Sequence, residues 1–139
     1  MTDLKLMLAP HLSFNGNAAD AMRFYHSVIG GELKMETLEA KVPHGPGESN
    51  RIIHATLNYG DFQLMAADGR SDMKVVFGDN VSLSITGSDA EKLTEIFIGL
   101  AQGGKVVMSL AKQFWGDTFG MVTDKFGVHW MINISTQPM

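Results

Sequence analysis

The sequence contains an internal repeat, and this repeat dictates the architecture that we expect. Residues 12–20 (LSFNGNAAD) align without gaps against residues 83–91 (LSITGSDAE). Each copy reads as a strand with alternating apolar residues, followed by a glycine turn and the start of a helix. Two copies of one supersecondary unit in a chain of 139 residues indicate a fold built from two similar modules.

A run of apolar residues at helical spacing follows each copy and ends at a glycine pair, Gly30-Gly31 or Gly103-Gly104. Glycine ends a helix readily because it adopts the left-handed conformation without a steric penalty. The helical positions are Ala18, Ala21, Met22, Tyr25, Val28 and Ile29 in the first copy, and Leu93, Ile96, Phe97, Leu100 and Ala101 in the second. Both runs therefore predict amphipathic helices that cover one face of a sheet.

Polar residues at the start of each helix predict how its first turn is capped. Ser88 and Glu91 have the spacing of a capping box, in which the hydroxyl and the carboxylate each bind an unpaired backbone amide. Asn17 and Asp20 form a weaker version of the same pattern.

Three strands are predicted after the helix in each half, with glycine-containing turns inside the two hairpins. The strand ranges are 32–38, 51–58 and 61–68 in the first half, and 105–111, 118–123 and 128–134 in the second. The fold class is therefore α+β, with two βαβββ modules that form curved mixed sheets and carry their helices on the outer face. We expect residues 1–139 to form a single domain, with module one at about 5–68, a linker at about 69–79 and module two at about 80–135.

Side-chain alternation along the strands predicts which face of each sheet forms a concave cavity. The consistently apolar positions should face the helices, and they are Leu12, Phe14, Val81, Leu83, Ile85, Trp130, Ile132 and Ile134. The predicted ligand cavity then contains His11, Ser13, His54, Thr56, Met65, Ser82, Trp115, His129 and Met131. A hollow with mixed polar and apolar side chains is typical of a small-molecule site.

Composition excludes several classes of protein. Because cysteine is absent, disulfides, zinc-thiolate sites and iron–sulfur clusters are excluded. Residues 1–10 lack the apolar stretch of a secretory signal, so we expect a cytoplasmic protein. No run reaches the roughly 18 apolar residues that span a bilayer. The net charge is −4 and the basic residues are scattered, so we expect neither a membrane nor a nucleic acid as partner.

Several segments resemble a known family. They are residues 11–16 (HLSFNG), the hairpin from His54 to Ala66, residues 113–120 (QFWGDTFG) and residues 126–133 (FGVHWMIN). Together they resemble the PhnB-like branch of the glyoxalase/bleomycin-resistance/dioxygenase (vicinal oxygen chelate) superfamily, and the resemblance runs nearly end to end. It implies the paired βαβββ fold, a homodimer, and a cavity inside each curved sheet.

The resemblance also implies where a metal ion would bind. Enzymes of the superfamily usually hold a divalent metal through His, Glu or Gln on the first and last strands of each module. The first-strand positions fall near Pro10 or His11 and near residues 80–82, and the last-strand positions fall on Met65 and Met131. A neutral thioether is a poor ligand for such cations. We therefore predict no catalytic metal and no other cofactor.

Each candidate site residue has a functional and a structural interpretation. His11, His54 and His129 share the predicted concave face and could form a three-histidine metal site, or each could be satisfied by its neighbours. Trp115 either contacts a ligand or closes the cavity mouth, and Asp117 either takes part in catalysis or caps a turn. A glycine-rich phosphate loop is absent, which argues against a methyltransferase with a nucleotide-type cofactor.

Three functions fit these observations. The first is a metal-free module that binds an apolar or aromatic small molecule between the curved sheet and loops that carry Trp115 and residues 73–77. The second is an enzyme: a lyase, isomerase or dioxygenase with a degenerate metal site, or a catalyst that uses histidine for proton transfer. The third is a dimeric interaction protein that works through its surface.

Overall fold

The computed structural model describes residues 6–38, 51–70 and 72–136. The chain divides into two compact units, Met1–Val75 and Val76–Met139, called unit 1 and unit 2 below. The division falls inside the predicted linker. None of the helices in the described part of the chain is long and apolar enough to span a membrane.

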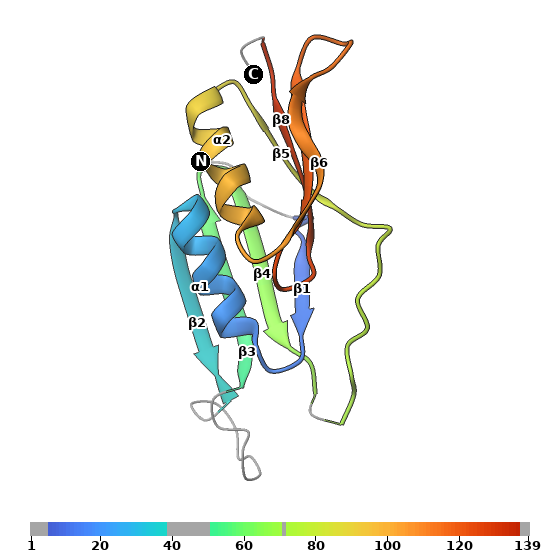
Figure 1. The fold of residues 1–139 in the computed structure, drawn as a ribbon. Helices are drawn as coiled ribbons and strands as arrows, with labels where there is room; N and C mark the ends of the chain where they lie inside the picture. Colours follow the sequence, from blue (N-terminus) through green and yellow to red (C-terminus); the bar gives the residue numbers. More distant parts are fainter. Residues whose placement is uncertain (1–5, 39–50, 71, 137–139) are drawn as a thin grey trace. The chain divides into compact units, whose positions relative to one another are not determined.

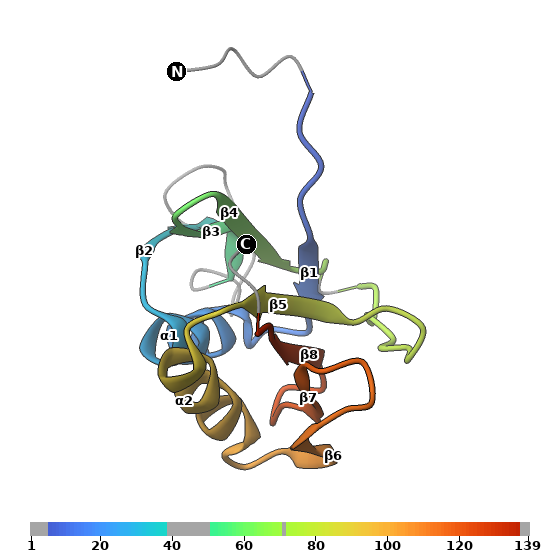
Figure 2. The same cartoon turned by 90° about the horizontal axis from the view of Figure 1, so that it is seen from above.

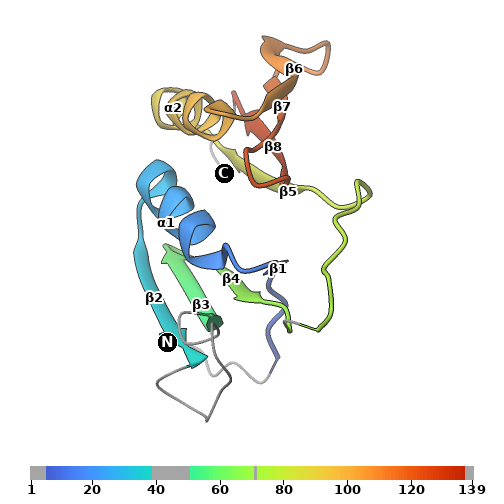
Figure 3. The same cartoon turned by 60° about the horizontal axis from the view of Figure 1, so that its bottom comes forward.

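Unit 1 contains one helix and a mixed sheet of four strands. Along the chain its elements are β1 (His11–Phe14), α1 (Ala18–Ile29), β2 (Glu32–Thr37), β3 (Ile52–Tyr59) and β4 (Phe62–Asp68). The strand order is β1-β4-β3-β2, and β1 pairs with β4 in parallel while the other pairs are antiparallel (Figure 1). Figure 3 shows α1 lying across one face of this sheet.

Unit 2 repeats this arrangement. Its elements are β5 (Leu83–Gly87), α2 (Ala90–Ala101), β6 (Lys105–Lys112), β7 (Thr118–Thr123) and β8 (His129–Ile134). The strand order is β5-β8-β7-β6, again with one parallel pair, and α2 lies on one side of the sheet (Figure 2). The predicted α+β fold of two βαβββ modules is therefore confirmed.

Each helix buries its apolar stripe against one face of its own sheet. In unit 1 the buried residues are Ala18, Ala21, Met22, Tyr25 and Ile29 on α1, and Phe14, Ala55, Leu57, Leu64 and Ala66 on the strands. In unit 2 they are Leu93, Ile96, Phe97 and Leu100 on α2, and Val122, Trp130, Ile132 and Ile134 on the strands. The predicted orientation of Trp130, Ile132 and Ile134 toward the helix is confirmed, and alternation along a strand then places their neighbours on the opposite face.

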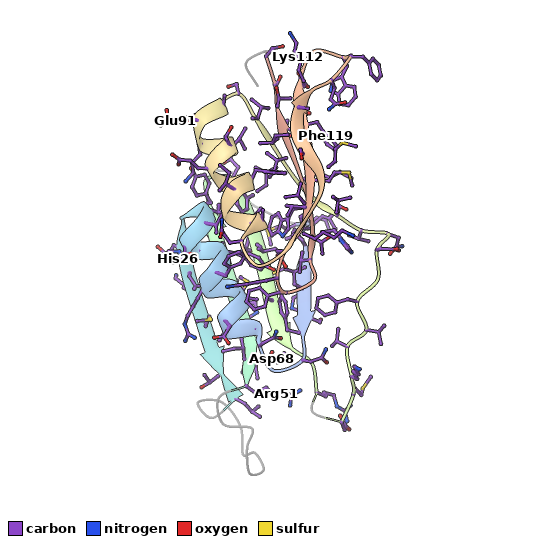
Figure 4. All side chains as sticks on the ribbon, viewed as in Figure 1. His26, Arg51, Asp68, Glu91, Lys112 and Phe119 are labelled. Atoms are coloured by element: carbon purple, nitrogen blue, oxygen red, sulfur yellow. The ribbon has the colours of Figure 1, made fainter. Side chains whose placement is uncertain are left out.

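The start of α1 is capped by a carboxylate that is distant in sequence. Asp68, labelled at the end of β4 in Figure 4, is 9% exposed. Its Oδ1 accepts hydrogen bonds from the backbone N–H groups of Gly16 and Ala18, both at 2.9 Å, and its Oδ2 accepts one from Ile52 at 2.9 Å. Asn17 occupies the N-cap position but makes no side-chain cap bond. Asp68 therefore replaces the local cap that the sequence predicted at this helix.

The predicted capping box at α2 is wrong by one residue. The helix begins at Ala90, and its N-cap is Asp89, whose side chain accepts a hydrogen bond from the backbone N–H of Lys92 at 3.1 Å. Aspartate is as good an N-cap as serine, so the adjacent acid competes with Ser88 for this role. The predicted glycine stops are confirmed, because Gly30 and Gly103 have φ values of 95° and 74°.

Strand boundaries differ from prediction by one or two residues. β5 begins at Leu83, where its pairing with Trp130 of β8 starts, so Val81 and Ser82 precede the strand. Val81 is 70% exposed and does not face the helix as predicted. β5 is an edge strand, so its hydrogen bonds to β8 alone determine where it begins.

Candidate functional site

The face of the unit 1 sheet that α1 does not cover, called the unit 1 distal face, carries five of the predicted site residues. Strand register places three of them in one row, because His11 pairs with Met65 and Met65 pairs with Thr56. Lys34 of β2 continues the row opposite Thr56. His11 is exposed, while Met65 and Thr56 are half-buried. This row therefore combines an imidazole, a thioether, a hydroxyl and an ammonium group.

The other two residues, Ser13 and His54, lie one row further along the same face. Ser13 pairs with Ala67, and His54 pairs with Glu36. With adjacent strands about 4.8 Å apart and a rise of about 3.3 Å per residue, the Cα atoms of His11 and His54 lie about 12 Å apart. Strand side chains project roughly perpendicular to their sheet. The structure therefore places these two imidazoles in separate positions on the face.

His129 has both ring nitrogens engaged. Its Nε2 lies 3.0 Å from the carbonyl oxygen of Gly78, and its Nδ1 lies 2.9 Å from Oγ1 of Thr123. Because a carbonyl oxygen can only accept, Nε2 carries the proton, and in the neutral ring Nδ1 accepts from the threonine hydroxyl. The imidazole fastens the segment before β5 to β8, with no nitrogen lone pair directed toward a ligand.

The face of the unit 2 sheet that α2 does not cover, called the unit 2 distal face, is rich in sulfur and aromatic rings. One row runs across all four strands, because Ser84 pairs with Met131, Met131 with Met121, and Met121 with Met108. Phe119, labelled in Figure 4, lies in the next row and pairs with Asn133. Met121, Met131 and Phe119 are half-buried, so this face offers apolar surface to a bound molecule.

Trp115 projects from the turn between β6 and β7. Two backbone hydrogen bonds close the turn, from the N–H of Gln113 to the oxygen of Asp117 at 2.8 Å and from Gly116 to Gln113 at 3.0 Å. The indole is 50% exposed and meets the ring of Phe119 edge-on at 6.1 Å between centroids. Trp115 therefore extends the aromatic surface that Phe119 begins.

Asp117 is the last residue of the same turn, and its side chain makes hydrogen bonds beyond it. Its Oδ2 accepts a hydrogen bond from Nδ2 of Asn133 at 3.0 Å, and its Oδ1 lies 3.4 Å from the backbone nitrogen of Thr136. These bonds join the turn to β8 and to Thr136, so the Asp117 side chain does not cap a backbone group of the turn itself. The Asp117–Asn133 pair places two polar groups at the border of the aromatic surface.

Sequence reasoning found part of the unit 2 distal face and missed the rest. Met131 and Trp115 were predicted as cavity residues, whereas Met108, Met121 and Phe119 were not. Alternation along β7 already separates Met121 from the buried Val122 and could have identified it. The position of Met108 could not be inferred, because β6 has register shifts on both sides of this residue.

The remaining predicted residue, Ser82, is half-buried and precedes β5. His11, Ser13, His54, Thr56 and Met65 thus belong to unit 1, and Ser82, Trp115, His129 and Met131 belong to unit 2.

The last-strand positions at which the family resemblance implies metal ligands do not fit a hard cation here. Met65 and Met131 occupy them, on β4 and β8, and both lie on distal faces. Their thioethers are neutral, soft donors that Mg²⁺, Mn²⁺ and Zn²⁺ bind poorly. Within residues 6–38, 51–70 and 72–136, no group of three or more His, Cys, Asp or Glu side chains is arranged to hold a metal ion.

Comparison with known proteins identifies the family. A model of the family described as 3-demethylubiquinone-9 3-methyltransferase matches residues 7–133. The chain belongs to this PhnB-like family. It is 32% identical to the protein YjdN of Escherichia coli K12, over 94% of this chain and 96% of the relative. It is 30% identical to the uncharacterized protein Mb0911c of Mycobacterium bovis, over 90% of this chain and 80% of the relative.

Solved structures agree with this assignment. The protein PA1353 from Pseudomonas aeruginosa is 36% identical, with a TM-score of 0.85 over 94% of this chain and 98% of that chain. A PhnB protein from Bacillus cereus, described as a putative 3-demethylubiquinone-9 3-methyltransferase, is 28% identical, with a TM-score of 0.77 over 94% of this chain and 100% of that chain. A glyoxalase/bleomycin resistance protein/dioxygenase family enzyme from Burkholderia phytofirmans shares the fold at 14% identity, with a TM-score of 0.60 over 89% of this chain and 94% of that chain. The predicted membership of the PhnB-like branch is therefore confirmed, and the chain shares the fold of this glyoxalase/bleomycin resistance/dioxygenase family enzyme.

Proposed function

We propose that this PhnB-like protein binds an apolar or aromatic small molecule on the unit 2 distal face, without a catalytic metal. The observation that carries the proposal is the continuous surface of Trp115, Phe119, Met121 and Met131, each at least partly accessible and none covered by α2. Aromatic rings and thioethers bind flat apolar molecules through stacking, edge contacts and shape adaptation.

The groups around this surface supply limited polarity. Asp117 and Asn133 are hydrogen-bonded to each other at its border and can orient one polar group of a ligand. His129 on the same face is held by Thr123 and Gly78. The surface is therefore suited to recognising shape and aromatic character, with a single polar anchor.

The test uses N-phenyl-1-naphthylamine, a neutral aromatic probe whose fluorescence rises in apolar sites. We expect saturable binding to the full chain, and at least tenfold weaker binding to Trp115→Ala, because the indole is 50% exposed and adjoins the ring of Phe119. The matched control is Phe62→Ala in unit 1, which removes another exposed ring, 38% accessible, that is not part of this face. Binding that is absent, or that is equally strong in both variants, would refute the proposal.

A second candidate function is proton-transfer catalysis on the unit 1 distal face. His54 of β3 pairs directly with Glu36 of β2, and both side chains are exposed. Imidazole and carboxylate groups are side chains that commonly transfer protons in acid–base catalysis. In a screen of lyase and isomerase reactions, this candidate predicts an activity that is lost in His54→Ala and kept in His26→Ala, whose histidine is exposed on α1. An activity that both variants retain would exclude it.

We also propose a homodimer, as the family resemblance implies. Light scattering after size-exclusion chromatography tests this, because the dimer has twice the 15.2 kDa mass of one chain. A mass of one chain at micromolar concentration would contradict it.

A further inference from the structure

The methionines of unit 2 are unevenly distributed. Among the described residues of this unit, the methionines are Met108, Met121 and Met131, and all three lie in one cross-strand row of the distal face. The face under α2 is built from other apolar residues, such as Val122, Trp130 and Ile132. If methionine served only to fill irregular apolar space, it would be expected in that core as well.

The row brings three sulfur atoms within reach of one another. Met121 is directly opposite Met131 on one side and Met108 on the other. Directly opposed residues in antiparallel strands have Cβ atoms about 5 Å apart, so the two outer methionines are separated by about 10 Å. Each side chain has three rotatable bonds, which let the outer sulfurs bend toward the central one. Met108 is 44% exposed, so a solute can reach the row from its β6 end.

We propose that Met108, Met121 and Met131 form a three-thioether site for a soft monovalent cation, Cu(I) or Ag(I). Thioether sulfur prefers soft d¹⁰ cations, while the hard and borderline divalent ions need oxygen or imidazole ligands. The ligands are neutral and have no proton to lose, so binding does not compete with protonation. Phe119, two residues from Met121 on the same face, adds a ring that can shield a bound cation.

The internal repeat supplies a comparison within the chain. In unit 1 the corresponding row contains Met65, but its neighbours across the strands are His11 and Thr56. One thioether alone makes a weak site. The proposal therefore assigns the soft-cation site to unit 2, although both modules have a methionine at the same position of their last strand.

The test titrates Ag(I), which is not oxidised by air, into the full chain labelled with ¹³C at the methionine methyl groups. We expect one equivalent to shift the signals of Met108, Met121 and Met131 and to leave that of Met73, which is 61% exposed in the segment before β5. Met121→Leu keeps the apolar volume and removes the central donor, so we expect at least tenfold weaker binding. Met73→Leu is the matched control and should bind as the wild type does.

Several results would overturn the proposal. They are equal shifts of all accessible methionine signals, wild-type affinity in Met121→Leu, or binding that is lost when the pH falls from 7 to 5, which would indicate histidine ligands. If Met121→Leu does not fold, Met108→Leu tests the same point at a more exposed position. Trp115→Ala should retain Ag(I) binding, so failure of this site and failure of the aromatic-ligand proposal are distinguishable.

Discussion

Asp68 offers the sharpest test of how unit 1 is held together. Its carboxylate accepts three backbone hydrogen bonds, from Gly16 and Ala18 at the start of α1 and from Ile52 at the start of β3. The side chain thus joins the end of β4 to two segments that are 16 and about 50 residues away. Replacing it with alanine leaves these donors without the carboxylate.

The expected magnitude follows from the burial of the donors. The bonds from Ala18 and Ile52 are buried, and each buried donor that loses its acceptor costs about 1–3 kcal/mol. The bond from Gly16 is only partly buried, so water can replace much of it. We therefore expect Asp68→Ala to lower the free energy of unfolding by about 4 kcal/mol. Asp68→Asn should lower the free energy of unfolding by about 2 kcal/mol. The amide oxygen can still accept hydrogen bonds from Gly16 and Ala18, but the amide nitrogen is a donor and cannot accept the bond from the N–H of Ile52.

Urea denaturation followed by circular dichroism measures these free energies. The dependence of the unfolding free energy on urea concentration should be the same in all variants. Asp20→Asn is the control, since this carboxylate on α1 is 76% exposed and lies 3.8 Å from Arg23. Exposed ion pairs of this kind contribute less than about 1 kcal/mol. If Asp68→Ala were no more destabilising than Asp20→Asn, the capping role derived for Asp68 would be refuted.

Two further predictions concern close contacts and the segment after β4. Gly120→Ala should destabilise unit 2 by about 1–3 kcal/mol, because the new Cβ would lie 2.8 Å from Cε2 of Phe97. Gly78→Ala is its control and should change thermal stability by less than about 0.5 kcal/mol, since the nearest atom is 3.7 Å away; equal effects would contradict the packing argument. Asn15→Ala should speed hydrogen exchange at Val75, whose N–H donates to Asn15 Oδ1 at 2.7 Å and whose carbonyl accepts from Asn15 Nδ2 at 3.0 Å. Unchanged exchange would show that this pair of bonds does not hold the segment.

The candidate site was only partly predictable. Alternation along single strands correctly predicted that His11 and Met65 lie on the face opposite the buried residues, because alternation can be read from each strand alone. Pairing between strands cannot be read in this way. The residues that a side chain contacts on other segments depend on how the whole sheet assembles. The carbonyl that engages His129 belongs to Gly78, which lies 51 residues away.

The sequence by itself determined the two-module architecture. The repeat, the helical periodicity and the glycine stops are local patterns, and local backbone preferences translate them into the same elements in both halves. Tertiary structure alone decided that Asp68 caps α1 and that Met108 completes a row of thioethers. A carboxylate about 50 residues from its donors, and a strand whose register shifts at irregularities, acquire their neighbours only when the sheet assembles.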